Sequence, residues 1–568
     1  MPERLLVCTA WPYANGPIHL GHVAGAYLPA DIFARYHRTK GDQVLMVSGS
    51  DQHGTPVTVR AEQEGKPVAE VADAYHRSFL DTWQRLGISF DLFTSTHTQN
   101  HQEVVYEIWR GLKAKGFLYE GTMPLMYCPA DDRYLPDRYV TGTCPHCGFT
   151  GARGDQCDSC GRPLNGVELI DPVCTFCKNA SSTPEMRDSQ HYFLKLSALN
   201  QELLDWVEQH GKGLWRQNVY KFTQNFLSEG LHDRAITRDI EWGVPVPEPG
   251  WDRKRIYVWF EACIGYLSAT VEWHKAHGDP EGWKDYWYQS RGAKIYNFIG
   301  KDNIPFHTII WPGMLMGYNH DLVEAGGEAL NLAYEVPANE FLTLEGRKFS
   351  TSGNWALWVP DYLERYDPDP LRYVVTANMP ESSDTDFSWR EFVRRNNDEL
   401  VAAYGNLVHR VLTFTYRNFE KQVPTPGPLD DVDRALLARS EEALAAVATS
   451  IEGVRLREGI RHAMALAQDA NRYLDDKAPW KSLKVDRDAT ATTLHTAITA
   501  IAALKQAFSP FLPFSSQKLH ELLGRSGTCH DEGWRVVTPA PGQALPEPAP
   551  LFVKLDDKII EEETARLG

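Results

Sequence analysis

The sequence predicts a parallel α/β fold that is split by a cysteine-rich insertion and followed by a bundle of helices. Three observations lead to this prediction. Short apolar runs alternate with helical patterns at the start of the chain and again after the cysteines. Closely spaced cysteine pairs interrupt the alternation, and long Ala- and Leu-rich amphipathic segments follow it.

Length and charge limit the possible classes of protein. A chain of 568 residues is long enough for several domains. It has no apolar run long enough to cross a membrane and no signal peptide at its start, so we expect a cytoplasmic protein. A net charge of -17 argues against a general nucleic-acid coat protein, because non-specific affinity requires a basic face. An RNA held by local basic patches is compatible with that charge.

The first predicted strand ends in a loop with two histidines. Leu5 to Val7 form an apolar run without alternation, as in a strand buried on both faces. After turn residues, His19-Leu20-Gly21-His22 opens a helical pattern. A helix N-terminus favours anions such as phosphate, because its backbone N–H groups are unpaired. Without further context, two histidines at this spacing are more often incidental residues.

The context is a family resemblance. The run from Thr9 to His22, TAWPYANGPIHLGH, resembles the ATP-binding signature of class I aminoacyl-tRNA synthetases, and within them the methionyl-tRNA synthetases. The resemblance covers nearly the whole chain. It is most specific in this loop, the cysteine cluster, the segment WFEACIGY at 259–266 and the loop KFSTS at 348–352. It implies a Rossmann-like nucleotide-binding parallel sheet, split by a zinc-binding insertion and followed by an all-α anticodon-binding bundle.

The expected domains follow from these patterns. We expect the first half of the catalytic fold at 1–115, the zinc-binding connective insertion at 116–234, the second half of the catalytic fold at 235–325, a KMSKS-like loop and stem-contact region at 326–390, the anticodon-binding bundle at 391–538, and a Pro-rich linker with a closing helix at 539–568.

A second strand is expected at Val44 to Val47, followed by a polar loop. Ligands of open α/β sheets bind outside the carboxyl ends of the strands, so this loop and the first one share a site. Asp51 and His53 are its notable polar groups, although capping residues are common in such loops. The resemblance assigns Asp51 to the amino group of the substrate, because a carboxylate suits an ammonium.

The cysteines predict zinc. Two CxxC knuckles separated by nine residues, Cys144 to Cys147 and Cys157 to Cys160, suit one tetrahedral ion. A second set is nested outside them and consists of Cys128, Asp131, Cys174 and Cys177. Family members with two zinc ions have cysteine where this chain has Asp131, so it stays open whether the second set of residues binds a zinc ion. Both sites are expected to be structural, because four protein ligands leave no position for a substrate.

Three segments after the insertion, 236–247, 256–268 and 293–315, are expected to complete the sheet, each with a strand core and a helical pattern. An aromatic stripe such as that of the second segment is more often plain core. The resemblance instead implies a methionine pocket, and a thioether packs well on aromatic rings. The implied pocket residues are Ala10, Trp11, Tyr13, Trp259, Ala262, Cys263, Tyr266 and His307. Trp11 and Cys263 depart from the commoner leucine and proline.

The resemblance also implies the ATP site. Gly300-Lys301-Asp302 fits a loop against the nucleotide, where Asp302 accepts ribose hydroxyls; a solvated surface loop is the alternative. Lys348 matches the first lysine of the KMSKS loop, whereas Thr351 stands at the second lysine and Arg347 is the adjacent cation. His19, His22 and Lys348 are the expected catalytic groups. ATP, with Mg²⁺ on its phosphates, is expected to contact Tyr13, Asn15, Gly21, Gly300, Asp302, Lys348 and Thr351.

The helical region carries the implied anticodon contacts. In the family, the residues at Asn406, Arg410 and Trp480 bind the anticodon by hydrogen bonding and base stacking. Surface polar residues and a helix-capping tryptophan are the alternatives that the pattern alone favours. No appended tRNA-binding domain of the dimeric relatives fits in the remaining sequence, so we expect a monomer.

The expected function is methionine–tRNA ligase, which forms methionyl-adenylate from ATP and L-methionine and charges tRNA(Met), initiator and elongator. A synthetase for valine or leucine is the rival within the class, and the lack of a large editing insertion speaks against it. A catalytically impaired tRNA-binding paralogue is the other rival, because the second loop lysine is missing. The intact HLGH and Asp51 favour activity.

Overall fold

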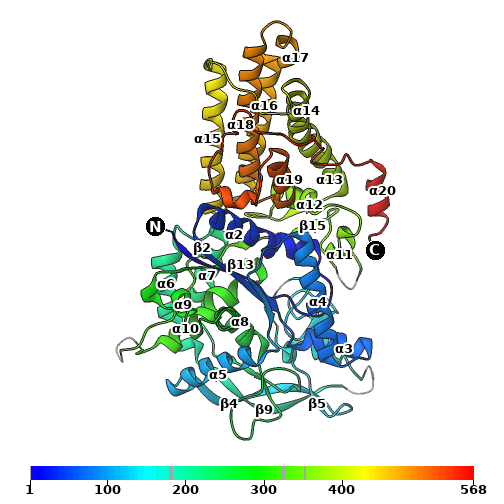
Figure 1. Cartoon of the computed structure of the whole chain (residues 1–568). Helices are drawn as coiled ribbons and strands as arrows, with labels where there is room; N and C mark the ends of the chain where they lie inside the picture. Colours follow the sequence, from blue (N-terminus) through cyan, green and yellow to red (C-terminus); the bar gives the residue numbers. More distant parts are fainter. Residues whose placement is uncertain (1, 161, 163, 178–182, 323–325, 351–352) are drawn as a thin grey trace.

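The computed structural model describes residues 2–568 apart from 161, 163, 178–182, 323–325 and 351–352. Thr351, predicted to contact ATP, therefore lies outside the described residues. Figure 1 shows an α/β body with a helical bundle standing on one end and a mostly β insertion at the other. Among the described residues, no helix combines the length and apolar character that a bilayer crossing needs.

A five-stranded parallel sheet lies at the centre of the body. Its order is β14-β13-β1-β2-β3, and its strands are β1 (Arg4–Thr9), β2 (Gln43–Ser50), β3 (Leu92–Ser95), β13 (Lys294–Gly300) and β14 (Ala338–Asn339). The predicted apolar run is fully buried in β1, and in β2 it is buried from Leu45 to Val47, whereas Val44 is half-buried. Because β1 pairs with β2 on one side and β13 on the other, the chain order reverses around β1. Such a reversal opens a crevice at the carboxyl ends of the strands.

Only one of the three segments expected to complete the sheet does so. The segment 293–315 contributes β13, whereas 236–247 and 256–268 contribute β11 (Thr237–Arg238) and β12 (Arg255–Ile256), which pair with each other in a separate antiparallel sheet. The apolar run that begins at Val258 belongs to helix α8 (Val258–Ala276), which is buried on nearly all sides. A helix buried all round has no polar face, so its short apolar runs resemble a buried strand.

The helix after β1 is continuous from Leu20 to Lys40, with α1 (Leu20–His22), a π-helical turn at Val23–Tyr27 and α2 (Leu28–Lys40). Three helices follow, α3 (Thr55–Glu64), α4 (Val68–Leu86) and α5 (Gln99–Ala114). The insertion pairs the long strands β4 (Leu118–Cys128) and β9 (Glu185–Leu194) beside a small sheet of β6 (Val140–Thr143), β7 (Ala152–Arg153) and β8 (Ile170–Cys174). Helices α6 (Asn200–Trp206) and α7 (Gln217–Ser228) lead back to the body.

The second half of the chain is mainly helical. Its elements include α10 (Trp311–Asn319), α11 (Val359–Leu363), α12 (Pro368–Ala377), α13 (Trp389–Arg395), α14 (Asn406–Asn418), α15 (Asp431–Glu452), α16 (Leu456–Lys477), α17 (Pro479–Ser482), α18 (Arg487–Phe508), α19 (Pro513–Leu522) and α20 (Lys558–Thr564). One hydrophobic core runs from Val7 in the sheet through Phe33 of α2 to Phe508 in the bundle. The bundle and this face of the sheet therefore share one packed core.

Candidate active site and metal centres

The loop after the central strand presents both predicted histidines as one unit. His19 caps α1, and its backbone N–H donates to Nδ1 of His22 at 3.3 Å. The two imidazole rings stack with their centroids 3.7 Å apart. A Cβ on Gly21 would lie 3.0 Å from the His19 ring, so a glycine gives the stacked pair its room.

Both imidazoles are neutral near neutral pH. Burial, with a smaller contribution from His22, lowers the pKa of His19 well below its usual value, and burial lowers the pKa of His22 to about 4. Because Nδ1 of His22 accepts a hydrogen bond, its proton sits on Nε2. Among the described residues, the buried Nδ1 of His19 has no hydrogen-bond partner. The pair therefore offers N–H donors to an anion rather than a positive charge.

Asp51 lies against the same loop. Its backbone N–H donates to the carbonyl of Pro12 at 2.8 Å, and its carbonyl accepts from Ala14 at 2.8 Å. The residue is 3% exposed, and its carboxylate accepts from the backbone N–H of His53 at 3.1 Å. Burial and the nearby charge of Glu261 raise the pKa of Asp51 well above its usual value. Within the described part of the chain, no basic side chain pairs with this carboxylate.

A second buried carboxylate, Glu261 of α8, has two histidine partners. Its Oε1 lies 2.7 Å from Nδ1 of His53, and its Oε2 lies 2.5 Å from Nε2 of His101. The other nitrogen of His101 lies 2.8 Å from the hydroxyl of Ser268. Burial alone would raise the pKa of Glu261, but the histidines hold it at about 2. Glu261 is therefore ionised beside Asp51.

The aromatic stripe of α8 packs against the loop after β1 and against the segment after β13. The ring of Trp259 stacks on Phe306 at 3.9 Å, and Tyr13 meets Trp259 edge-on at 6.0 Å. The hydroxyl of Tyr266 donates to Nε2 of His307 at 2.6 Å, while Nδ1 of His307 donates to a backbone carbonyl four residues earlier at 2.9 Å. Burial lowers the pKa of His307 to about 4, so the ring is neutral and both of its nitrogens are engaged.

Trp11 lies between two glycines. A Cβ on Gly49 of β2 would lie 2.3 Å from its indole, and a Cβ on Gly265 of α8 would lie 2.8 Å from it. Cys263 and Ala262 are buried on the same helix, and the carbonyl of Ala10 accepts from Tyr27 at 2.8 Å. The space for the unusual tryptophan therefore comes from two glycines, Gly49 on the sheet and Gly265 on the helix, which carry no side chain.

The Lys348 loop touches the histidine pair. Phe349 stacks on the ring of His19 with centroids 4.9 Å apart and planes 12° from parallel. Lys348 is exposed beside it, whereas the guanidinium of Arg347 lies over the ring of Trp355 at 4.0 Å. The structure thus brings the loop predicted from its sequence to the HLGH turn, with the extra arginine stacked on an aromatic ring.

The end of β13 supplies the remaining predicted loop. Gly300 is the last residue of that strand, and a Cβ there would lie 2.8 Å from Oδ1 of the exposed Asp302. The strand β13 neighbours β1 in parallel, so this loop and the HLGH loop open at the same edge of the sheet. Asn15, in the first loop, is half-buried.

The cysteines gather into two clusters. The ligand atoms of Cys144, Cys147, Cys157 and Cys160 lie within 4.8 Å of one another, and so do those of Cys128, Asp131, Cys174 and Cys177. The sulfur atoms of Cys147 and Cys157 are 3.6 Å apart, as are those of Cys128 and Cys177. These separations exclude disulfides and are close to the ~3.8 Å between ligands of a tetrahedral zinc thiolate. Both clusters could therefore bind a metal ion.

Two family models match the chain. Residues 5–412 match tRNA synthetases class I (M), and residues 423–568 match the anticodon binding domain of methionyl tRNA ligase. The chain belongs to the methionyl-tRNA synthetase family.

Relatives support this assignment over the full length. The chain is 56% identical to a methionine–tRNA ligase of Dehalococcoides mccartyi over 568 residues, with all of both chains covered. It is 51% identical to that of Thermomicrobium roseum, with 100% of this chain and 99% of the relative covered. A crystal structure of Mycobacterium tuberculosis methionyl-tRNA synthetase bound by methionyl-adenylate matches with a TM-score of 0.80 at 26% identity, covering 97% of this chain and 100% of that one.

In this methionyl-tRNA synthetase family member, two of the three predicted anticodon contacts touch each other. The guanidinium of Arg410, on α14, lies 5.1 Å from the ring centroid of Trp480, which is 39% exposed on α17. Asn406 is exposed one helical turn before Arg410. Figure 1 shows α17 at the end of the bundle farthest from the sheet. A cation stacked on an exposed indole suits the stacking of unpaired bases.

Sequence reasoning missed several residues of the site. Glu261 carried a usable signal, because an acid inside an apolar helical stripe must find a partner when it is buried. Phe306 and Phe349 carried none, since their ring contacts depend on how distant loops approach each other. The roles of Gly49 and Gly265 likewise depend on the place of Trp11.

Proposed function

We propose that this chain activates L-methionine with ATP and transfers the methionyl group to the 3′ end of initiator and elongator tRNA(Met), as a monomer in the cytoplasm. The observation that carries the proposal is the meeting, at one edge of the sheet, of neutral histidine donors, a buried carboxylate that has no cationic partner among the described residues, and a cluster of aromatic side chains. Each of the three suits one part of the substrates: the phosphates, the ammonium and the thioether.

The methionine site follows from Asp51. A buried carboxylate without a cation is unfavourable, and a bound ammonium supplies the missing partner. The side chain then extends over Trp259 toward the hydrogen-bonded pair of Tyr266 and His307. Aromatic faces suit a polarisable thioether. Ala10, Trp11, Tyr13, Ala262 and Cys263 complete the proposed pocket.

The chemistry needs positioning and charge stabilisation. The methionine carboxylate attacks the α-phosphorus in line, an O–P bond forms and the bond to pyrophosphate breaks. His19 and His22 donate N–H groups to the phosphate oxygens, and Lys348 supplies positive charge; Mg²⁺ enters as part of the ATP substrate. Tyr13, Asn15, Gly21, Gly300, Asp302 and Thr351 are the further proposed ATP contacts. A terminal ribose hydroxyl of tRNA then attacks the adenylate carbonyl, and AMP leaves.

We further propose that both cysteine clusters hold Zn²⁺. The donor set of three thiolates and one carboxylate in the outer cluster also suits a tetrahedral ion. Zinc would link the strands of the insertion and stabilise its fold. Elemental analysis of purified protein should give two zinc ions per chain, and Cys147→Ser and Asp131→Ala should each give about one. One ion per chain in the unaltered protein would contradict the proposal for the second site.

The deciding experiment is methionine-dependent ATP–pyrophosphate exchange, with valine, leucine and norleucine as comparators, followed by charging of tRNA(Met) transcripts. We expect exchange with methionine well above that with the comparators, and methionyl-tRNA as product. Folded, zinc-loaded protein without exchange would instead support the impaired paralogue, and exchange gained by Thr351→Lys would identify the loop as the cause. Light scattering tests the monomer, and cell fractionation tests the compartment.

A further inference from the structure

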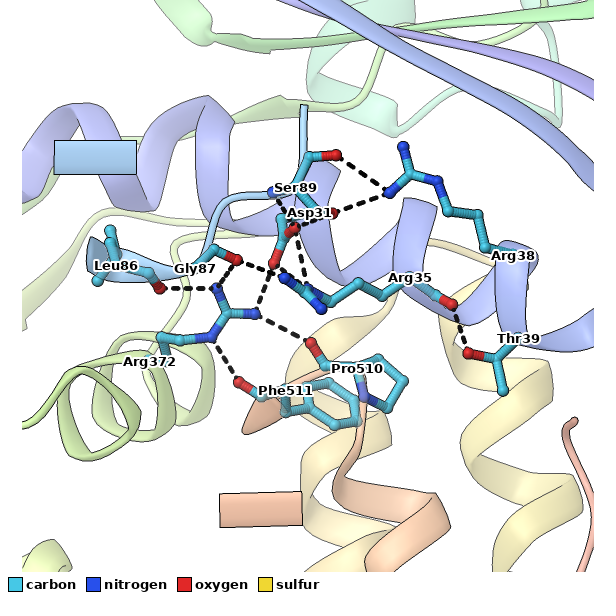
Figure 2. Close-up of polar contacts among 10 residues, drawn as sticks. All are labelled: Asp31, Arg35, Arg38, Thr39, Leu86, Gly87, Ser89, Arg372, Pro510 and Phe511. Carbon is cyan, nitrogen blue, oxygen red and sulfur yellow. Dashed lines mark hydrogen bonds and ion pairs between the residues drawn. The ribbon is translucent and has the colours of Figure 1, made fainter. Parts of the chain in front are cut away.

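One guanidinium in the protein interior joins four separate segments (Figure 2). Arg372 of α12 has a side chain without solvent exposure, and each of its five N–H donors has an acceptor. Its Nη2 lies 2.6 Å from Oδ2 of Asp31. Its other acceptors are the backbone carbonyls of Phe511 at 2.8 Å, Pro510 at 3.0 Å, Leu86 at 3.3 Å and Gly87 at 3.3 Å.

These acceptors come from parts of the chain with different tasks. Asp31 lies on α2, the continuation of the helix that begins at HLGH. Pro510 and Phe511 follow α18, one of the long helices of the bundle that carries Trp480 at its far end. Leu86 and Gly87 end α4 of the catalytic fold. A single side chain therefore connects the catalytic fold with the anticodon-binding bundle.

Asp31, the partner of Arg372 in the catalytic fold, has further hydrogen bonds that fix its position. Oδ1 of Asp31 accepts from the backbone N–H of Ser89 at 2.8 Å and from its hydroxyl at 2.6 Å. Arg35 donates to the same carboxylate at 2.9 Å and to the carbonyl of Gly87 at 2.7 Å. Asp31 lies nine residues after His22, which is about 14 Å along a continuous helix. A displacement of the bundle at Phe511 would therefore reach the HLGH turn.

A second arginine, which is half-buried, connects the same helix with another segment of the bundle. Arg216, the residue that precedes α7, donates to the carbonyl of Val454, between α15 and α16, at 2.9 Å and to Oδ1 of Asn339 at 2.6 Å. The amide of Asn339 donates in turn to the carbonyl of Ala24 at 2.8 Å. The helix that starts at HLGH is thus tied to two separate segments of the bundle.

We propose that Arg372 is a positioning residue that fixes the anticodon-binding bundle to the HLGH helix, so that a tRNA bound at Arg410 and Trp480 delivers its 3′ end to the adenylate. This inference rests on the proposed function. A buried ion pair often contributes little net stability compared with an apolar pair of the same size. An apolar pair could not make the directional hydrogen bonds that one guanidinium makes to both domains.

The test uses Arg372→Lys, which keeps a charge for Asp31. An ammonium has three donors on one atom and cannot span the carbonyls of both domains. Arg365→Lys is the matched control. Arg365 lies between α11 and α12, and its two bonds at 2.8 Å go to Glu563 of the C-terminal helix rather than to the bundle and α2.

We expect Arg372→Lys to retain methionine-dependent pyrophosphate exchange within about twofold, while kcat for charging of tRNA(Met) falls at least tenfold and KM for tRNA changes little. Arg365→Lys should lower neither. Single-turnover transfer from preformed adenylate should be slowed as much as charging. Unchanged charging by Arg372→Lys, or equal losses of exchange and charging, would overturn the proposal.

Two further measurements keep the inference testable. If Arg372→Lys fails to fold, Arg372→Met with Asp31→Asn removes both charges together, and the same split between exchange and charging is expected. Amide hydrogen exchange needs no activity: peptides that cover 28–40 and 508–513 should exchange faster in Arg372→Lys than in Arg365→Lys. Equal rates of amide hydrogen exchange in the two variants would count against the proposed connection between α2 and the bundle. If the unaltered protein exchanges no pyrophosphate, the proposed function is overturned. The hydrogen-exchange comparison then still tests whether Arg372 connects the two domains.

Discussion

Asp31 and Asp51 are both fully enclosed carboxylates, yet their environments act in opposite directions. Arg35, Arg372 and Ser89 overcome the effect of burial and hold the pKa of Asp31 at about 2. Asp51 has one backbone N–H and a neighbouring negative charge, and its pKa is raised well above the usual value. The first aspartate has cationic partners within the chain, whereas the second has none among the residues that the structure describes.

If Asp51 binds the substrate ammonium as proposed, the difference separates a structural acid from a binding acid. A carboxylate that is already paired gains nothing from a ligand and loses stability when its partner leaves. An unpaired buried carboxylate is costly until a cation arrives, so part of that cost is relieved on binding. The four predictions below test this distinction.

The largest expected effect is that of Asp51→Asn on methionine activation. Removal of a buried charge that pairs with the substrate ammonium should lower kcat/KM for methionine about 10³-fold, or ~4 kcal/mol. The KM for ATP should change little, and the melting temperature should be unchanged or higher because an unfavourable acid is lost. Steady-state exchange kinetics and a thermal melt measure both. A variant with normal kcat/KM would remove Asp51 from the site.

Asp31→Asn should act on stability instead. Its amide can still accept from Ser89, but Arg372 is left as a buried charge without a carboxylate, which costs about 3 kcal/mol. Thermal and urea unfolding measure the loss, and exchange activity per folded molecule should stay near that of the parent. A melting temperature within about 1 °C of the parent would show that the buried pair is unimportant for stability.

The two acids should also respond to different ranges of pH. The pKa of Asp51 is raised in the free protein, and bound ammonium favours its ionised form. Methionine affinity therefore falls as the pH drops below that raised pKa, and binding releases a proton. The pKa of Asp31 is lowered from 3.8 to about 2, so its stabilising contribution is complete above about pH 4 and is lost as the pH falls toward 2. Calorimetry in buffers of different ionisation enthalpy should detect the released proton, and a methionine affinity independent of pH would contradict the assignment.

Glu261→Gln should give the smallest effect. The ionised Glu261 raises the pKa of Asp51, so its neutral replacement should move the midpoint of methionine binding to lower pH. The affinity at high pH should change by only a few-fold, because Asp51 is ionised there in both proteins. His101→Gln, which keeps the carboxyl group of Glu261 and can still donate a hydrogen bond to it, is the matched control. A shift of the midpoint to higher pH would show that the two carboxylates do not interact as described.

The sequence predicted what depends on local pattern. Some features carry their signal within a few residues: the buried runs of β1 and β2, the cysteine clusters and the HLGH turn. In the structure, they lie where the predicted fold class has them. The prediction that the segment 256–268 joins the sheet is wrong, because a helix buried on nearly all sides has no polar face to reveal its period. Arg35, four residues after Asp31, is a local partner, but Ser89 and Arg372 lie 58 and 341 positions away, and no local pattern predicts contacts at such separations.

The packing of Trp11 against Gly265 restricts the order in which the proposed methionine pocket can change during evolution. The three atoms nearest to a Cβ at Gly265 all belong to the indole of Trp11, the closest at 2.8 Å. Alanine is therefore excluded at Gly265 while the tryptophan remains, and it becomes possible once position 11 carries a shorter side chain. A lineage that reshapes this wall must substitute Trp11 first, because the reverse order passes through an intermediate with a steric clash.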